Sequence, residues 1–148
     1  MTENNHKNIA TFIHLSTFSR FIIPFGNFIG PIVLWTANKE KSKFIDDHGK
    51  QAINFQISIL LYAMILGMIT IPFFIFGIFN NMDFLDFNFF DSIHINVNKP
   101  SPLLYIGGSL GFLAFLGFIL ELVFIITASL KARDGIRYKY PLTINFLK

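Results

Sequence analysis

The sequence has no cysteine among its 148 residues, and only 14% of the residues are charged. Without cysteine there are no disulfides, thiolate metal sites or cysteine nucleophiles, although the redox compartment stays open. Hydrophobic residues make up 53% of the chain, whereas a soluble domain usually carries roughly 25% charged residues. So short a chain has too little interior to bury this much apolar surface. The composition excludes a disordered chain and disfavours a soluble fold.

Catalytic signatures are also missing. There is no glycine-rich phosphate loop, no GxSxG nucleophile elbow and no HExxH zinc motif. The nearest approach to a metal cluster is Asp46-Asp47-His48, which lies among lysines and is interpreted as a solvated interface. The four histidines fall in separate segments and are not expected to converge: His6, His14, His48 and His94. The sequence therefore predicts no enzyme, no metal site and no cofactor.

Three apolar blocks are each long enough to cross a bilayer, which takes about 20 residues. They cover residues 9–37, 51–79 and 103–130. No small-residue cleavage site follows the first apolar stretch, so a cleaved signal peptide is not expected. The predicted fold is an all-α integral membrane helical bundle with three transmembrane helices, forming a single membrane domain over residues 1–148.

The first block is irregular because prolines and glycines cluster in its second half: Pro24, Gly26, Gly30 and Pro31. One interpretation is a single span kinked at this cluster, since proline removes a helical hydrogen bond. The other is a re-entrant pair of half-helices, which would return the N-terminus to its starting side. We favour the kinked span. In the second block we expect a continuous helix to Ile71, with a kink or a looser stretch from Pro72.

Basic residues indicate the orientation in the membrane. Lysines are frequent between the first two blocks, and five basic residues follow the third, whereas Lys99 is the only one in loop 80–102. We expect the first loop and the basic tail 131–148 to be cytoplasmic, and loop 80–102 and the N-terminus to be external. The net charge of +3 is interpreted as contact with anionic lipid, without nucleic acid. The expected location is the bacterial inner membrane.

Polar side chains inside the apolar blocks are costly and are therefore candidates for function. One face of the second block carries a polar stripe: His48, Gln51, Asn54, Ser58 and Tyr62. We interpret this polar stripe as a packing seam between helices, with a polar groove as the alternative. The candidate intramembrane polar site comprises His14, Arg20, Asn54, Gln56, Ser58 and Glu121.

Glu121 is the only acid inside an apolar block. Its expected partner is the Asn54/Ser58 part of the polar stripe, because a direct pair with Arg20 requires the kink or a tilt. Small residues share one face of the third block: Gly107, Gly111 and Gly117. Such a face lets another helix approach closely. It predicts helix packing, with membrane lipids, a second copy of the chain or other membrane proteins as partners.

Two further segments alternate apolar and polar residues, a pattern typical of short strands. The first is SIHINVN in loop 80–102, where a strand or hairpin is possible. The second is the tail IRYKYPLTINFLK, whose tyrosines beside basic residues suit the inner membrane interface.

The segments HLSTFSRFIIPFGNFIGPIVLW, KSKFIDDHGKQAINFQIS and KARDGIRYKYPLTINF together resemble the bacterial Tic-twenty-like membrane proteins, catalogued as domain of unknown function four-eight-seven-zero. The matching elements are His14-Leu15-Ser16, Gly30-Pro31 with Trp35, Asp47-His48-Gly49, Asn54-Phe55-Gln56 and the terminal Gly135 with Tyr140-Pro141-Leu142. The resemblance implies a small helical inner-membrane protein, similar in plan to a chloroplast import component with four helices. It implies no activity, cofactor or catalytic residue.

Two functions therefore remain open. The first is a non-enzymatic membrane component that acts through helix contacts in translocation, transport or envelope protection. The second is an ion- or proton-coupled carrier or channel that uses Glu121 and the polar stripe.

Overall fold

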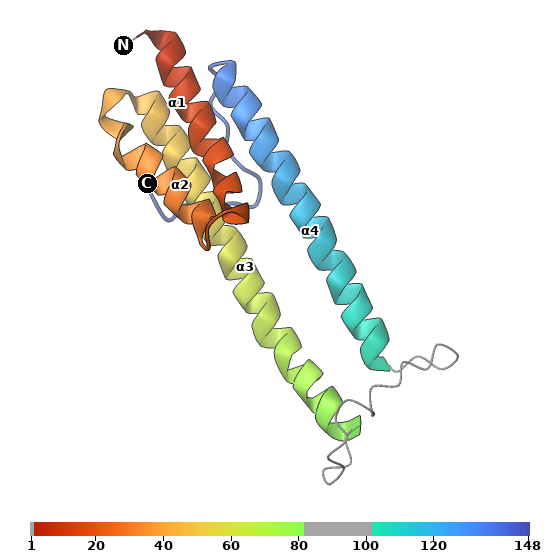
Figure 1. Cartoon of the computed structure of the whole chain (residues 1–148). Coiled ribbons are helices and arrows are strands. Elements are labelled where there is room, and N and C mark those ends of the chain that lie inside the picture. The colour runs from red at the N-terminus through yellow and green to blue at the C-terminus, as the bar shows by residue number, and fades with distance from the viewer. Residues whose placement is uncertain (1, 82–101) are drawn as a thin grey trace. The chain divides into compact units, whose positions relative to one another are not determined.

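The computed structural model describes residues 2–81 and 102–148, and these parts are helical with no strand (Figure 1). The elements in chain order are α1 (Glu3–Leu15), the 3-10 helix η1 (Ser16–Phe21), α2 (Gly26–Thr36), the 3-10 helix η2 (Lys39–Lys41), α3 (Lys43–Asn81) and α4 (Pro102–Arg133). Most of the expected external loop 80–102, with its possible strand, lies outside the described residues. The alternating tail after α4 forms no regular element.

The chain divides into two compact units. One unit holds Met1–Leu61 and Ile119–Lys148, and the other holds Tyr62–Phe118. The first unit contains α1, η1, α2, η2, the first half of α3, the last part of α4 and the tail. It also holds two buried clusters, one around Phe55, Ile125 and Tyr140 and the other around Ile13 and Ile45. The polar contacts described below all belong to this first unit.

The first apolar block is not the single kinked helix that the sequence favoured. The chain reverses at residues 22–25, and α2 returns along α1 and η1 as a helical hairpin (Figure 1). Phe25 adopts a left-handed conformation with φ of 59°. The Ser19 hydroxyl donates to the Gly26 carbonyl at 2.6 Å, which ties the two arms together. The hairpin matches the pair of half-helices in the re-entrant alternative.

Two glycines make this hairpin possible because their missing side chains let the arms touch. A Cβ atom on Gly26 would overlap the backbone carbonyl of Ser19 and come within 2.8 Å of the Arg20 nitrogen. A Cβ atom on Gly30 would lie 2.6 Å from the Ser16 carbonyl oxygen. The Pro/Gly cluster thus acts as a turn and a close-approach surface, where the sequence suggested a kink.

The two long helices, α3 and α4, agree with the second and third predicted blocks more closely than the hairpin agrees with the first. The third block begins its helix at Pro102, as expected for proline at a helix start. α3 starts earlier than expected, at Lys43, and the Ser42 hydroxyl accepts from the Ile45 amide at 3.2 Å as an N-cap. α3 also continues as a helix through Pro72 to Asn81, so the looser stretch that was one of the two expectations for this proline does not occur.

Two helical segments in the described residues are long and apolar enough to cross a membrane, Lys43–Pro72 and Gly107–Arg133. Their mean hydropathies are 1.9 and 2.5, yet only 33% and 11% of their apolar windows are buried within the chain. A core helix of a soluble protein would be mostly buried, so this exposure favours a helical membrane protein. Three spans are not confirmed, because the first block folds into the hairpin.

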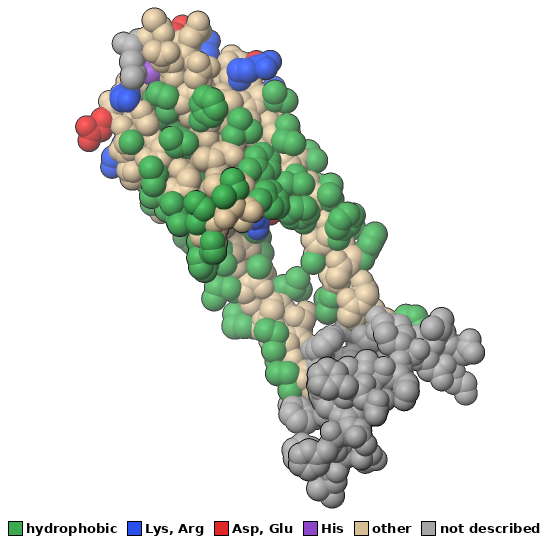
Figure 2. All heavy atoms as spheres, in the orientation of Figure 1, with side chains coloured by type: hydrophobic (Ala, Val, Ile, Leu, Met, Phe, Trp, Pro, Cys, Tyr) green, Lys and Arg blue, Asp and Glu red, His purple; other side chains and the backbone are tan. Residues whose placement is uncertain are grey.

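Hydrophobic side chains cover the visible face of the hairpin and run along α4, as Figure 2 shows. The hairpin turn is especially exposed, with Ile22 at 83% and Phe25 at 73% of their full accessibility. Charged side chains gather instead at the end of the first unit that holds η2 and the C-terminal end of α4 (Figure 2). The first unit therefore has one apolar end and one charged end, and the charged end is suited to contact with lipid headgroups.

Candidate functional site

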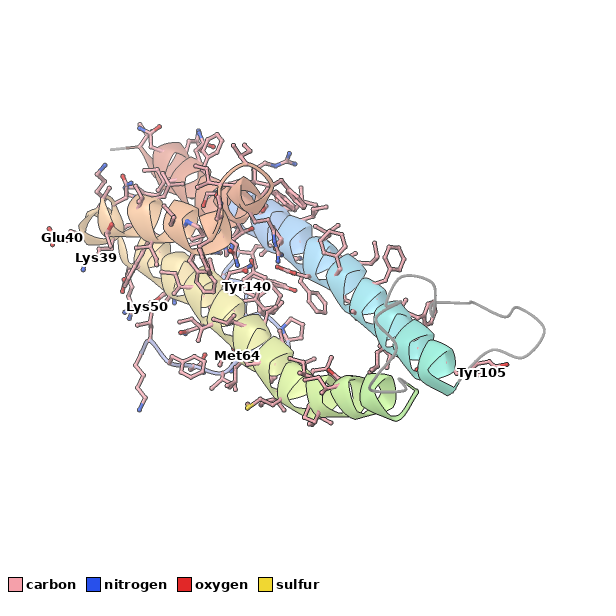
Figure 3. All side chains as sticks on the ribbon, turned by 60° about the horizontal axis from the view of Figure 1, so that its bottom comes forward. Lys39, Glu40, Lys50, Met64, Tyr105 and Tyr140 are labelled. Carbon is pink, nitrogen blue, oxygen red and sulfur yellow. The ribbon has the colours of Figure 1, made fainter. Side chains whose placement is uncertain are left out.

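Three aromatic side chains from α1, α3 and the tail form a buried hydrogen-bonded chain. The hydroxyl of Tyr140 lies 2.9 Å from Nδ1 of His14, and Nε2 of His14 lies 2.8 Å from Nδ1 of His48. All three residues are at most 2% exposed. Tyr140, labelled in Figure 3, also stacks on Phe55 of α3 at 4.1 Å between ring centroids. The expectation that the histidines do not converge was therefore wrong for His14 and His48.

The direction of donation along this Tyr140–His14–His48 chain of hydrogen bonds follows from the buried hydroxyl. His14 is the only hydrogen-bond partner of the Tyr140 hydroxyl within the described residues. An O–H buried without an acceptor is costly, so Tyr140 donates to Nδ1 of His14. His14 then carries its proton on Nε2 and donates to Nδ1 of His48. Because Nδ1 of His48 accepts this hydrogen bond, neutral His48 carries its own proton on Nε2.

Burial also sets the charge states of these groups. It lowers the pKa of His14 to about 3, with a smaller contribution from the charge of His48. It raises the pKa of the Tyr140 hydroxyl well above its usual value, with smaller contributions from Tyr138 and Glu121. His14 and Tyr140 are therefore both neutral at physiological pH, as the hydrogen-bonded chain requires.

We expect acid to destabilise the first unit through His14. Unfolded His14 binds a proton below its ordinary pKa of 6.5, whereas the folded residue does not until about pH 3. The contribution of His14 to stability is therefore complete above pH 6.5 and is lost as pH drops toward 3, with a slope approaching about 1.4 kcal/mol per pH unit. Thermal unfolding of the detergent-solubilised protein across this range measures the slope. His14→Gln should make the slope shallower by the part that His14 contributes, and an unchanged slope in that variant would contradict the assignment.

Glu121 pairs directly with Arg20, which corrects the expectation that it contacts Asn54 and Ser58. Nη1 of Arg20 lies 2.5 Å from Oε1 of Glu121, whose side chain is 5% exposed. The pair joins η1, just before the chain reverses at residues 22–25, to α4.

The polar stripe of α3 is occupied by the tail. The Asn54 amide donates to the carbonyl of Leu147 at 3.0 Å and accepts from its backbone N–H at 2.8 Å. Ser58 accepts from the backbone N–H of Ile144 at 2.9 Å. The tail thus docks on α3 as an extended segment held by side chains. The packing-seam interpretation was right about the face, although the element packed there is the tail.

Other predicted residues also find local partners. Gln56 accepts from the side-chain amide of Asn27 on α2 at 2.8 Å. The Trp35 indole donates to Asp46 at 2.9 Å, and its ring lies against Gly49, where a Cβ atom would overlap it. Gln51 lies at a cavity near the tail, and Tyr62 belongs to the other unit. These contacts fasten the hairpin to the start of α3.

The glycine face of α4 is open. A Cβ atom on Gly111 or Gly117 would meet no atom of the described chain within 4 Å. A partner helix is therefore not supplied by this chain at these positions, and packing against another molecule stays a prediction. Within residues 2–81 and 102–148, no group of three or more His, Asp or Glu side chains is placed to hold a metal ion.

Sequence reasoning missed Tyr140 as a partner of His14 and Asn27 as a partner of Gln56. Tyr140 was noted as part of a shared element and as a tyrosine suited to the membrane interface, whereas it is buried at 2% exposure. Its signal was an aromatic residue directly before a proline in an otherwise basic tail. Nothing local to the sequence indicates that this tail returns to the middle of the bundle.

The family of magnetosome magnetite crystal formation proteins, MamF/MmsF, matches residues 5–147. Comparisons with curated proteins and with solved structures gave no significant match. The match covers nearly the whole chain, so the chain belongs to the MamF/MmsF family. The resemblance to the Tic-twenty-like family is thereby corrected, and with it the suggested role in translocation.

Proposed function

We propose that this member of a magnetite crystal formation family is a non-enzymatic component of the magnetosome membrane that acts through helix contacts. The observation that carries the proposal is the extent of the family match, residues 5–147. It includes the hairpin, both long helices and the docked tail. The role of the family therefore concerns the whole helical chain and not one catalytic segment.

The distribution of polar contacts favours a function through helix packing over a function as a carrier. A carrier needs ionisable or polar groups that are free to exchange a cargo. Here Glu121 is paired with Arg20, and Asn54 and Ser58 are bonded to the tail backbone. The groups that the carrier hypothesis required are thus occupied by internal structural contacts.

Open apolar surfaces supply the contacts that the proposal needs. The hairpin turn exposes Ile22 and Phe25, which suit the bilayer interior. The face with Gly111 and Gly117 leaves room for the backbone of a second helix. We propose that these surfaces bind lipid and a neighbouring membrane helix, so that copies of the chain assemble in the membrane around the growing crystal.

The charged end of the first unit indicates the orientation we propose. It carries η2 and the end of α4, with Lys39, Lys41, Lys131 and Arg133. By the preference of basic residues for the cytoplasmic side, this end faces the cytoplasm. Because the hairpin returns on itself, the start of α1 lies on the same side, and the external N-terminus expected from three spans is replaced by a cytoplasmic one.

We expect vesicles that carry the protein to change the magnetite formed from mixed ferrous and ferric salts. Crystals sized by electron microscopy should show a narrower distribution than with protein-free vesicles of the same lipid. Gly111→Leu with Gly117→Leu should shift the distribution back, because leucine separates helices that need close approach. Identical distributions with and without protein would overturn the proposal.

The same vesicles test the carrier hypothesis. We expect no proton or cation flux in the wild type or in Glu121→Gln. Flux that is present in the wild type and lost in Glu121→Gln would favour the carrier, whatever the crystals show.

A further inference from the structure

A cavity of about 410 Å³ lies where the tail meets the start of α3. It is lined by residues from the start of α3 and from the tail, among them His48, Gln51, Lys139 and Lys148. All of these residues belong to the first unit, and we call the cavity the tail pocket. Its volume falls within the range of small-molecule binding sites.

Two residues that line the tail pocket carry buried polar atoms without hydrogen-bond partners. Nε2 of His48 and Oε1 of Gln51 are both buried and make no hydrogen bond in the described chain. His48 is only 1% exposed. Buried polar groups in native proteins are normally satisfied, so an unsatisfied pair at a cavity indicates a ligand or ordered water there.

The hydrogen-bonded chain gives this site its donor. Because Tyr140 donates to His14 and His14 donates to His48, the remaining proton of neutral His48 lies on Nε2. His48, which lines the pocket, therefore carries an N–H on a ring whose tautomer is fixed by two buried partners. Rotation of the Gln51 side-chain amide by half a turn exchanges its O and N, which places an NH₂ donor where the unsatisfied Oε1 now lies.

The charge of the tail pocket favours an anion. Its lining has four cationic side chains, Lys50, Arg137, Lys139 and Lys148, against one carboxylate, Asp47. Arg137 pairs with Asp47 at 3.1 Å, and Lys50 pairs with Asp46 at 2.6 Å. Lys139 and Lys148 make no ion pair within the described residues, so their charge is uncompensated. Oriented N–H donors beside ammonium groups are the usual ligands of phosphate.

We propose that the tail pocket binds a phosphate group, with His48 and Gln51 as hydrogen-bond donors and Lys139 and Lys148 as countercharges. The pocket lies at the charged end of the first unit, beside the start of an apolar helix. Basic pockets at such positions bind lipid headgroups. An anionic phospholipid is therefore the expected source of the phosphate. Phosphate binding in the tail pocket does not depend on the role in magnetite formation.

Thermal unfolding of the full chain in a neutral detergent tests the proposal. Added phosphatidylglycerol should raise the unfolding temperature, and zwitterionic phosphatidylcholine should do so much less. Lys139→Gln with Lys148→Gln should raise the half-maximal lipid concentration about tenfold, as expected for losing charge-assisted contacts. The matched control is Lys41→Gln with Lys43→Gln, which removes two cations that do not line the pocket and should leave that concentration unchanged.

Tyr140→Phe tests the oriented donor separately. Without the hydroxyl, the two histidines can adopt the opposite tautomers, so phosphatidylglycerol should bind several-fold more weakly. Size-exclusion chromatography confirms that each variant is folded before lipid is added. Protection by millimolar inorganic phosphate but not by lipid would support the phosphate site with a soluble source. Equal lipid effects in the pocket and control variants, or none in the wild type, would overturn the proposal.

Discussion

Gly26→Ala is expected to destabilise the protein by about 3 kcal/mol, the upper part of the usual range for overpacking. The added methyl group would overlap the Ser19 carbonyl and crowd the Arg20 nitrogen. Both atoms belong to the backbone of η1, so no side chain can rotate away to relieve the overlap. The hairpin must open, and Arg20 then moves away from Glu121. Chemical unfolding in detergent measures the loss, and limited proteolysis at residues 22–25 reports the opening.

Gly67→Ala is the matched control for this prediction. Gly67 lies inside α3, where a Cβ atom would have its nearest contact at an ordinary 3.8 Å. Alanine should therefore leave stability unchanged or raise it by roughly 0.5–1 kcal/mol through the backbone entropy of the helix. If Gly26→Ala behaved like this control, the first block would be the kinked span that the sequence favoured.

Arg20→Met is expected to cost about 3 kcal/mol, because it leaves the buried carboxylate of Glu121 without its countercharge. Glu121 is 5% exposed and faces Arg20 alone among the charged side chains that the structure describes. Thermal unfolding in detergent provides the measurement. Arg133→Met is the control, since Arg133 is 68% exposed and lies 3.9 Å from Asp134. Exposed pairs of this kind contribute little, so no measurable loss is expected there.

A second substitution separates the loss of the pair from the loss of packing. Arg20→Met combined with Glu121→Leu removes both charges, and well-packed apolar replacements of an ion pair are often neutral or stabilising. The double variant should therefore recover most of the stability that Arg20→Met loses. A double variant as unstable as the sum of its single changes would show that the two residues do not interact.

The sequence by itself determined the apolar composition and the long helices. Apolar blocks over 51–79 and 103–130 became α3 and α4, because helix formation and exposure to lipid depend on residues near in the chain. Pro102 began α4 as its fixed backbone angle predicts. The polar stripe was also found, since the positions of Asn54 and Ser58 on one face follow from helical periodicity.

Only the tertiary structure decided what those polar residues contact. His14 and His48 are 34 residues apart, Arg20 and Glu121 are 101 apart, and Tyr140 meets His14 over 126 residues. Each pairing depends on the reversal at residues 22–25 or on the return of the tail. A Pro/Gly cluster is compatible with either a kink or a turn, because glycine permits close approach without requiring it. The choice rests on the fit of Gly26 and Gly30 against η1, which no local pattern records.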